Sequence, residues 1–373
     1  MIKIGITGQS GFIGSHLYNF LSIKKETTTL VSFKKEFFLQ EKQLEAFVEK
    51  CDVIVHLAAV NRADNPDDTL YTNVLLVKKL IKACQQIKVN PKIIFSSSTQ
   101  ETLDNTYGLS KIEGFNLLNS WAKENNTTVV KIIIPNVFGP FGKPNYNSVI
   151  ATFCHQLMSS IPLKIIDDNE LRLIFINDLI EKIYSHIISK KTGVLSDIVP
   201  HTSTIKVSAL KDILSSFHDA YHNENTFPNI ANSFYRNLFI TYMSYVSKSS
   251  FPKKLIQHKD ERGAFSEVTR ASSESQYSYS FTKPGVTRGN HYHTRKIERF
   301  VIIYGSAVIR LRKIKTDEVF EYTLEGETPS FIDIPVWHTH SITNVGETDL
   351  ITLFWINECY DPLDPDTFIE NVI

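Results

Sequence analysis

The chain has 373 residues, of which 42% are apolar and 21% charged, so it holds enough apolar material for two or three buried cores. Its 40 basic and 40 acidic residues cancel, and no excess charge favours a nucleic acid or an anionic membrane as partner. The N-terminus lacks a signal-peptide pattern, no apolar run approaches the roughly 18 residues of a membrane span, and four scattered cysteines form no CxxC pair. We therefore expect a cytoplasmic protein with free thiols.

The first 190 residues alternate short apolar runs with longer helical patterns. Five runs rich in Ile and Val have the composition of buried strands: 2–7, 28–33, 52–57, 92–97 and 129–134. Segment 66–87 between them opens on acidic residues and closes on basic ones, as helices do. This alternation predicts an α/β region with a parallel sheet covered by helices on both faces.

Three glycines, Gly8, Gly11 and Gly14, follow the first strand at the start of a helical stretch that includes Phe12 and Ile13. Glycines at this spacing permit a tight turn and let backbone N–H groups approach a pyrophosphate, while the helix N-terminus adds partial positive charge. The pattern predicts a dinucleotide site, and a tight turn without a ligand is the alternative.

Lys34 and Lys35 lie about 20 residues beyond the glycines, near the end of the second predicted strand. NAD-specific sites commonly place an acidic residue there to hold the ribose hydroxyls, whereas cations favour a 2′-phosphate. The two lysines therefore indicate NADPH rather than NADH, unless they are simply solvated surface residues.

A Tyr-x-x-x-Lys pattern occurs three times, and the expected local structure separates the three: Tyr107/Lys111, Tyr279/Lys283 and Tyr292/Lys296. The lysine must lie one helical turn from the tyrosine to lower the pKa of its phenol. Only Tyr107 and Lys111 open a helical stretch, directly after a buried strand ending at Ser98. We expect Ser98 to bind a substrate carbonyl, Tyr107 to donate a proton, and Lys111 to hold the tyrosine and the nicotinamide ribose.

The second half has a different pattern. Two helices are predicted in the intermediate region, at 206–222 and 231–246. After about residue 255, short strands alternate with Gly, Pro, Asn and Asp, and no long helical pattern occurs. This composition predicts an all-β barrel or sandwich.

His291 and His293 are two residues apart in one predicted strand, so both side chains point to the same face, with Glu298 shortly after them. His340 lies in another predicted strand. Imidazole and carboxylate ligands suit Zn²⁺, Fe²⁺, Mn²⁺ or Ni²⁺. The four side chains are a predicted metal site, in which His338 is a competing candidate for the role of His340.

The glycine motif, the sequence HLAA at 56–59, Ser98, Tyr107 and Lys111 together resemble the extended short-chain dehydrogenase/reductase (SDR) family over about residues 1–200. This resemblance implies a Rossmann-like domain that acts on a nucleotide-linked sugar, which a smaller lobe holds. It also implies that Arg172, in RLIFIND, and Asn136, in PNVFGPFG, bind the substrate.

The spacing from Gly285 through the three ligands to Gly305 resembles the first cupin metal motif, and Pro335 to Asn344 resembles the second. Trp337 stands where a glycine is usual, which puts the local turn in doubt. The resemblance implies a C-terminal cupin β-barrel with zinc as the leading ion, other divalent transition metals being possible. Segment 258–268 resembles the substrate strand of cupin epimerases acting on nucleotide-linked 4-keto-sugars, which implies substrate contacts by Arg262 and Glu267.

Five segments spread over the chain carry a closer resemblance: HLAAVNR at 56–62, SSSTQETLDNTYGLSK at 96–111, KPNYNSVIATFC at 143–154, KPGVTRGNHYH at 283–293 and DIPV at 333–336. Through them the whole chain resembles bifunctional capsular-polysaccharide enzymes of the UDP-N-acetyl-L-fucosamine pathway. The resemblance implies an NADPH-dependent SDR reductase domain with its substrate lobe at 1–245 and a cupin epimerase domain at 255–373. It further implies a homodimer that takes a UDP-linked 4-keto-6-deoxy amino sugar. The cupin would epimerise C3 of a UDP-2-acetamido-2,6-dideoxy-4-hexulose, and the SDR domain would reduce the C4 ketone to give a UDP-2-acetamido-2,6-dideoxy-L-talose.

Two alternatives remain open from the sequence. The first is a single-site SDR reductase or 4-epimerase whose cupin only dimerises the chain. The second is a binding module for sugar nucleotides without chemistry, which the presence of Ser98, Tyr107 and Lys111 disfavours. The general base of the epimerase is also open among Tyr292, His338 and a lysine.

Overall fold

The computed structural model describes residues 1–61, 65–223, 227–254, 258–260, 263–265, 275–358, 361 and 363–373. The chain forms two compact units: unit 1 comprises 1–149 and 168–207, and unit 2 comprises 150–167 and 208–373. Unit 2 therefore joins the helices of the middle region to the strands of the second half. The functional division into 1–245 and 255–373 stays a prediction.

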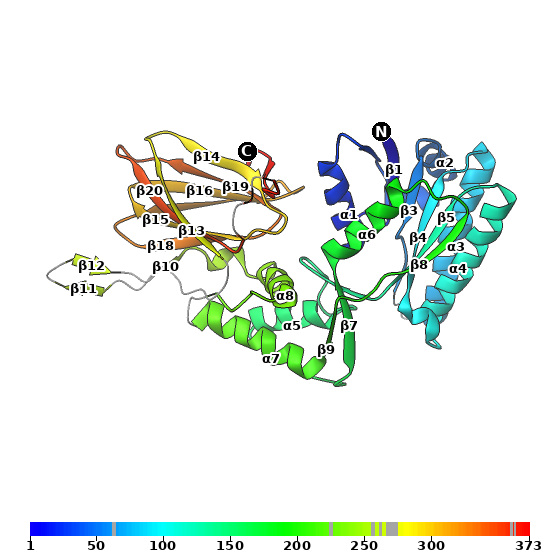
Figure 1. The fold of residues 1–373 in the computed structure, drawn as a ribbon, viewed down its shortest axis with the longest axis horizontal. Helices are drawn as coiled ribbons and strands as arrows, with labels where there is room; N and C mark the ends of the chain where they lie inside the picture. Colours follow the sequence, from blue (N-terminus) through cyan, green and yellow to red (C-terminus); the bar gives the residue numbers. More distant parts are fainter. Residues whose placement is uncertain are drawn as a thin grey trace. The chain divides into compact units, whose positions relative to one another are not determined.

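Unit 1 is built on a six-stranded parallel sheet in the order β2-β1-β3-β4-β5-β8 (Figure 1). The strands are β1 (Ile2–Thr7), β2 (Thr28–Val31), β3 (Val53–His56), β4 (Lys92–Ser98), β5 (Val129–Ile134) and β8 (Val194–Ile198). The five strands predicted from apolar runs are confirmed as β1 to β5. Because β1 lies between β2 and β3, the strand order reverses beside the glycine turn, where doubly wound sheets place their ligands.

Helices cover both faces of this sheet (Figure 1). Helices α1 (Phe12–Ile23) and α6 (Ile176–Ile188) contact each other on one face. Helices α2 (Glu41–Glu49), α3 (Pro66–Ile87) and α4 (Thr106–Glu124) cover the other face, where their apolar side chains form one core with β3 and β4. Short 3₁₀ turns η1 (Lys35–Leu39) and η2 (Thr99–Thr102) follow β2 and β4. A smaller sheet has the order β6-β7-β9, formed by β6 (Asn136–Phe138), β7 (Glu170–Phe175) and β9 (Ser203–Lys206).

The predicted helix 66–87 is confirmed as α3, and the residues at its two ends explain where it begins and ends. The Asn65 side chain accepts a hydrogen bond from Asp67 N at 3.2 Å, and Pro66 occupies the first turn, where it loses no helical hydrogen bond. The helix ends at Lys88, whose backbone is left-handed with φ 56°.

Unit 2 contains two five-stranded antiparallel sheets that pack face to face (Figure 1). The first has the order β10-β18-β15-β20-β13, with β10 (Lys253–Lys254), β13 (Gln276–Thr282), β15 (Glu298–Tyr304), β18 (Ser330–Ile334) and β20 (Leu350–Ile356). The second has the order β17-β16-β19-β14-β21, with β14 (Thr287–Tyr292), β16 (Ser306–Lys313), β17 (Val319–Glu325), β19 (His338–Asn344) and β21 (Phe368–Ile369). A separate hairpin pairs β11 (His258–Asp260) with β12 (Gly263–Phe265).

The helical segments in the described part of unit 2 are α5 (Val149–Met158), α7 (Val207–His218), η3 (Asp219–Asn223), α8 (Ser233–Met243) and the short η4 (Lys248–Ser250). The two predicted helices are confirmed, although residues 219–223 form a π-type turn instead of extending α7. Phe217, Phe239 and Tyr242 pack together with ring centroids 5.3–6.4 Å apart, so the aromatic residues of α8 form a core with α7. Within the described part of the chain, no helix combines the length and apolar composition needed to cross a membrane.

A buried ion pair joins this helical layer to the first sheet. The Arg299 guanidinium, fully buried on β15, donates to Asp333 of β18 from Nε at 2.7 Å and from Nη2 at 3.0 Å. The hydroxyl of Tyr221, in η3, donates to the same carboxylate. Phe227 and Phe331 lie against the guanidinium, 4.4 Å and 3.9 Å from their ring centroids. The pair satisfies both charges inside an apolar layer.

The turn before β19 forms despite the missing glycine of the motif. Trp337 adopts the left-handed conformation with φ 58°, which ordinarily favours glycine. Its backbone N–H donates to His293 O at 2.8 Å, and its ring stacks on Tyr292 at 5.6 Å. These contacts offset strain of about 1–3 kcal/mol.

We predict that Arg299→Met destabilises unit 2 by about 3–5 kcal/mol, because the substitution leaves the Asp333 carboxylate buried without its cation. Arg310→Met is the matched control: it removes an exposed pair with Glu321, Nε to Oε2 at 2.6 Å, and should change stability by no more than about 1 kcal/mol. Urea denaturation followed by circular dichroism measures both. Equal midpoints for the two variants would contradict a structural role of the buried pair.

Candidate functional sites

The glycine turn of unit 1 is shaped by close backbone approaches. Gly8 has φ 75°, and a Cβ atom there would lie 2.7 Å from Ala58 N, in the loop after β3. A Cβ atom at Gly14 would lie 2.1 Å from Gly8 O. Side chains at either position would therefore push β1, the β3 loop and α1 apart. Gly11 is the N-cap of α1 and supplies no side chain to cap the first-turn N–H groups, which suit an anion.

Two polar residues at the ends of β1 and β3 interact beside this turn. Thr7 Oγ1 and His56 Nδ1 lie 2.8 Å apart, both buried. Burial, together with the charge of Lys111, lowers the pKa of His56 to about 3, so the ring is neutral at physiological pH. The predicted cofactor residues Lys34 and Lys35 are exposed at the start of η1, where Lys34 precedes the turn and Lys35 opens it.

Ser98, Tyr107 and Lys111 come from the end of β4 and the first turns of α4. The loop after Ser98 packs on this helix so closely that a Cβ atom at Gly108 would lie 2.2 Å from Gln100 O. Asn105 caps the helix by accepting a hydrogen bond from Gly108 N at 2.7 Å. Lys111 Nζ lies 5.3 Å from the ring centroid of Tyr107, one helical turn away. The other two Tyr-x-x-x-Lys pairs begin in strands β13 and β14, as expected.

The protonation states suit a proton donor. Burial raises the pKa of Tyr107 to about 12, with a smaller contribution from Tyr146, so the phenol carries its proton at neutral pH. Burial lowers the pKa of Lys111 to about 8, a shift that the negative charge of Glu101 opposes. The lysine is therefore mostly charged at neutral pH and close to its titration midpoint.

Sequence reasoning missed an acidic group next to this set. The Glu101 carboxylate accepts a hydrogen bond from the Ser97 hydroxyl and forms a 3.2 Å ion pair with Lys131 of β5. Both charged side chains are more than four-fifths buried. Glu101 follows the buried strand by only three residues, in the turn that bears Ser98, and a polar residue at that position is the sequence signal that could have identified it.

Asn73 of α3 is another polar residue that sequence reasoning missed. Its side-chain amide donates to Ser110 Oγ and to Val60 O, and its side-chain oxygen accepts from Val60 N.

Asn136 and Arg172, which were predicted to bind substrate, lie on adjacent strands of the small sheet. Asn136 opens β6 and is paired in register with Leu173, the neighbour of Arg172 on β7. Both side chains are exposed. The structure thus brings them to one part of unit 1, each with its polar group available to a ligand.

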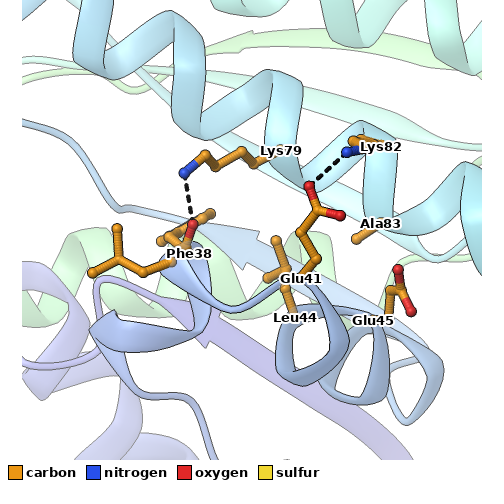
Figure 2. Close-up of a pocket in the computed structure, with 8 residues that line it drawn as sticks. Phe38, Glu41, Leu44, Glu45, Lys79, Lys82 and Ala83 are labelled. Carbon is orange, nitrogen blue, oxygen red and sulfur yellow. Dashed lines mark hydrogen bonds and ion pairs between the residues drawn. The ribbon is translucent and has the colours of Figure 1, made fainter.

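A small cleft of unit 1 lies away from these residues (Figure 2). It has a volume of about 120 Å³ and lies among η1, α2 and α3. Lys79 Nζ donates to Phe38 O at 2.7 Å, and Lys82 pairs with Glu41 at 2.5 Å across its rim. None of its lining residues belongs to the glycine turn or to the Ser98–Tyr107–Lys111 set.

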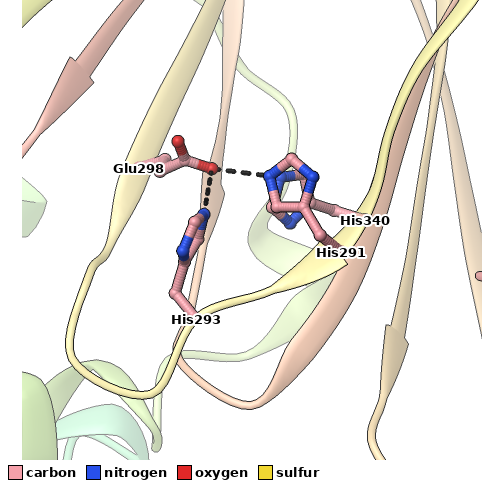
Figure 3. A group of neighbouring side chains, drawn as sticks. All are labelled: His291, His293, Glu298 and His340. Carbon is pink, nitrogen blue, oxygen red and sulfur yellow. Dashed lines mark ion pairs between the residues drawn. The ribbon is translucent and has the colours of Figure 1, made fainter. Parts of the chain in front are cut away.

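The predicted metal ligands of unit 2 converge. One ligand atom from each of His291, His293, Glu298 and His340 lies within 4.8 Å of the others. His291 and His340 are opposite each other on the paired strands β14 and β19, and Glu298 opens β15 in the facing sheet. Figure 3 shows the Glu298 carboxylate directed at two imidazoles, with Oε2 3.0 Å from His340 Nε2 and 3.4 Å from His293 Nε2.

The chemistry of this cluster fits a divalent metal ion. His293 Nε2, His340 Nε2 and Glu298 Oε2 are buried, and among the described residues they have no hydrogen-bond partner outside this cluster. Buried polar atoms that lack outside partners in this way are rare. Burial would raise the pKa of Glu298, but hydrogen bonds from His293 and His340 hold it below its ordinary value. Burial and the neighbouring histidines lower the pKa of His291 to about 4, so its ring is neutral, as a ligand must be.

Two residues that the sequence offered as candidates for a general base, Tyr292 and His338, lie on different faces relative to the histidine cluster. Tyr292 points to the opposite face of β14, where it stacks on Trp337 and Phe368 with centroids 5.6 Å and 5.4 Å away. His338 lies two residues before His340 on β19 and therefore on the same face as the metal cluster. It is not part of the cluster itself. Arg262 and Glu267, the predicted substrate contacts, lie outside the described residues.

Comparisons with known proteins match both parts of the chain. Residues 4–194 match the NAD dependent epimerase/dehydratase family, and residues 258–368 match the polysaccharide biosynthesis C-terminal domain. A UDP-2-acetamido-2,6-beta-L-arabino-hexul-4-ose reductase of Pseudomonas aeruginosa is 33% identical over 376 residues, covering 100% of this chain and 99% of that protein. The crystal structure of the capsular polysaccharide assembling protein CapF from Staphylococcus aureus is 34% identical, covers 100% of both chains and has a TM-score of 0.63.

We predict that the purified protein retains about one divalent metal ion per chain and that His340→Ala loses most of it, because four convergent ligands become three. His201→Ala, which changes an exposed histidine of unit 1, is the control and should retain the wild-type metal content. Elemental analysis after dialysis measures both. Equal metal content in the two variants would contradict the assignment of the ligands.

Proposed function

We propose that this chain, which belongs to the NAD dependent epimerase/dehydratase family and over its full length to the CapF-like proteins, is a two-site enzyme acting on a UDP-linked sugar. The substrate is a UDP-2-acetamido-2,6-dideoxy-4-hexulose. The cupin region of unit 2 epimerises C3, and the SDR site of unit 1 reduces the C4 ketone to give a UDP-2-acetamido-2,6-dideoxy-L-talose. The reductase named above, which matches this chain from end to end, supports this substrate class.

One observation carries the proposal: a single chain holds two chemically distinct clusters. Tyr107 and Lys111 form a proton donor with an adjacent cation, and the three histidines with Glu298 form a set of metal ligands. A chain with only one chemical step would need only one of them. The single-site alternative, in which the cupin serves only to dimerise the chain, gives no reason for three buried ligand atoms whose only described partners are one another.

The chemistry of the sugar fixes the order of the steps. A proton on C3 is acidic only while C4 is a ketone, because the resulting carbanion is delocalised onto the ketone oxygen. Reduction removes that activation, so epimerisation has to come first. When bound at the histidine cluster, a divalent ion such as zinc supplies a Lewis acid that polarises a carbonyl group.

At the SDR site, the residues of this chain orient the ketone and supply the proton. A nicotinamide cofactor supplies the hydride when bound at the glycine turn. Ser98 and Tyr107 bind the C4 oxygen, and the phenol gives its proton to that oxygen. Lys111, one helical turn away, stabilises the phenolate that remains and binds the nicotinamide ribose. Asn136 and Arg172 bind the nucleotide-sugar on the small sheet.

We also propose that the chain forms a homodimer through its cupin region. Tyr279 and Phe281, on the edge strand β13, are 66% and 55% exposed, and their rings contact each other at 5.9 Å. Large exposed aromatic residues on a strand edge are typical of interfaces between subunits.

We predict that Tyr107→Phe lowers the rate of NADPH oxidation by about 10²–10⁴-fold, because the ketone oxygen loses its proton donor. The exchange of the C3 proton with deuterated solvent should persist. Tyr71→Phe, at an exposed tyrosine of α3, is the control and should keep both activities. Absorbance at 340 nm and NMR of the sugar measure the two steps separately. Loss of C3 exchange in Tyr107→Phe would favour a single site, and absence of NADPH oxidation by the wild type would contradict a reductase.

We predict that the wild type prefers NADPH to NADH and that Lys34→Glu reduces this preference about tenfold or more, because a charged hydrogen bond to the 2′-phosphate contributes about 1.5–3 kcal/mol. Lys50→Glu, an exposed lysine at the end of α2, makes the same change of charge and should leave the preference intact. The ratio of kcat/KM for the two cofactors is the measurement. Equal efficiency of both cofactors with the wild type would remove this assignment.

A further inference from the structure

A buried carboxylate outside every sequence motif binds the loop at 294–296, which connects the candidate ligands His293 and Glu298. Asp366 is buried, 26 residues after the last ligand in the chain, and its side chain accepts hydrogen bonds from three successive backbone N–H groups. These are Thr294 N at 3.2 Å, Arg295 N at 2.8 Å and Lys296 N at 3.1 Å. The Thr294 hydroxyl adds a fourth donor at 2.5 Å. Successive N–H groups that point inward form a concavity for an anion, and here the chain supplies the anion itself.

The same residue orients one ligand directly. His293 Nδ1 lies 2.6 Å from the backbone oxygen of Asp366, which can only accept a hydrogen bond. Nδ1 therefore carries a proton, and in the neutral form that a metal ligand requires, the lone pair is on Nε2, which faces Glu298 and the other ligands. Asp366 thus acts on this loop with both its side chain and its backbone.

The segment around Asp366 is bound to the metal strands on both sides. Phe368 and Ile369 form β21, which pairs with Tyr292 and His291 of β14. Lys296 Nζ donates to Pro365 O at 2.9 Å. The Thr339 hydroxyl, next to His340, donates to the backbone oxygen of Glu370. Segment 364–370 therefore contacts the chain next to three of the four ligands.

The backbone of Asp366 is left-handed, with φ 44°, a conformation that few residues other than glycine adopt. This conformation lets the carboxylate and the carbonyl oxygen of one residue bind neighbouring parts of the same loop. The four donors to the side chain offset the strain.

We propose that Asp366 is a positioning residue of the metal site, which fixes loop 294–296 and the tautomer of His293 so that the ligand set is formed before the ion binds. The inference rests on the metal site of the proposed function. Partners that orient metal-ligating histidines tune affinity, and their loss typically weakens metal binding about 10–100-fold.

The test is metal affinity in the full-length protein. Metal-free wild type, Asp366→Asn and the control Asp364→Asn are titrated with Zn²⁺ against a chromophoric chelator. The Asp364 side chain is exposed, and its one described contact is with the Arg295 side chain at 2.8 Å. This control therefore changes a carboxylate bound to the same loop without affecting the backbone N–H groups of that loop. We expect Asp366→Asn to bind Zn²⁺ about 10–100-fold more weakly and Asp364→Asn to bind as the wild type does.

The absorption spectrum of bound Co²⁺ separates positioning from stability. A residue that only stabilises the fold would lower the melting temperature and leave this spectrum and the affinity unchanged, which would overturn the inference. If Asp366→Asn does not fold, Thr294→Val removes one donor to Asp366 and keeps every backbone bond, and wild-type affinity in that variant would also overturn it. Wild-type protein that binds neither Zn²⁺ nor Co²⁺ would refute the metal site itself and thereby the proposed epimerase chemistry.

Discussion

The pairing of β14 with β19 is the constraint on which the histidine–glutamate cluster of unit 2 depends. It places His291 opposite His340 and brings the two backbones so close at Gly289 that a Cβ atom there would lie 2.6 Å from His340 O. Gly289 has φ 99°, and the pairing shifts register directly after it. This bulge turns the following residues so that His291 and His293 both reach the ligand set, and Glu298 then approaches from the facing sheet.

Burial disfavours the charged form of the ionisable groups in both clusters, but the resulting charge differs between them. At Tyr107, burial keeps a phenol protonated beside a lysine that is close to losing its proton. At Glu298, two imidazole partners overcome burial and keep a carboxylate ionised. Burial is the main cause at Tyr107 and Lys111, whereas at Glu298 the combined effect of two close imidazoles exceeds it. The protonation states of the two sites therefore have different physical origins.

Most of the fold could be predicted from the sequence, because strands β1 to β5 and helix α3 carry strong local patterns. The cluster of candidate ligands could be predicted in part for the same reason, since His291, His293 and Glu298 are close in sequence. Contacts between distant segments could not. Asp366 reaches the ligand loop across about 70 residues, and Asp333 meets Arg299 and Tyr221 from three separate segments. Trp337 shows a third limit, because its left-handed backbone depends on a stack with Tyr292 that no local propensity reveals.

Glu298 and Arg299 are consecutive on β15 and face opposite sides of the sheet, one among the ligands and the other among the aromatic residues of the helical layer. A shift of this strand by one residue against its neighbours would exchange the two faces and bring a cation to the histidines and a carboxylate to the phenylalanines. Length variation among descendants of this gene should therefore avoid β15 and accumulate in exposed turns that carry no ligand of the cluster.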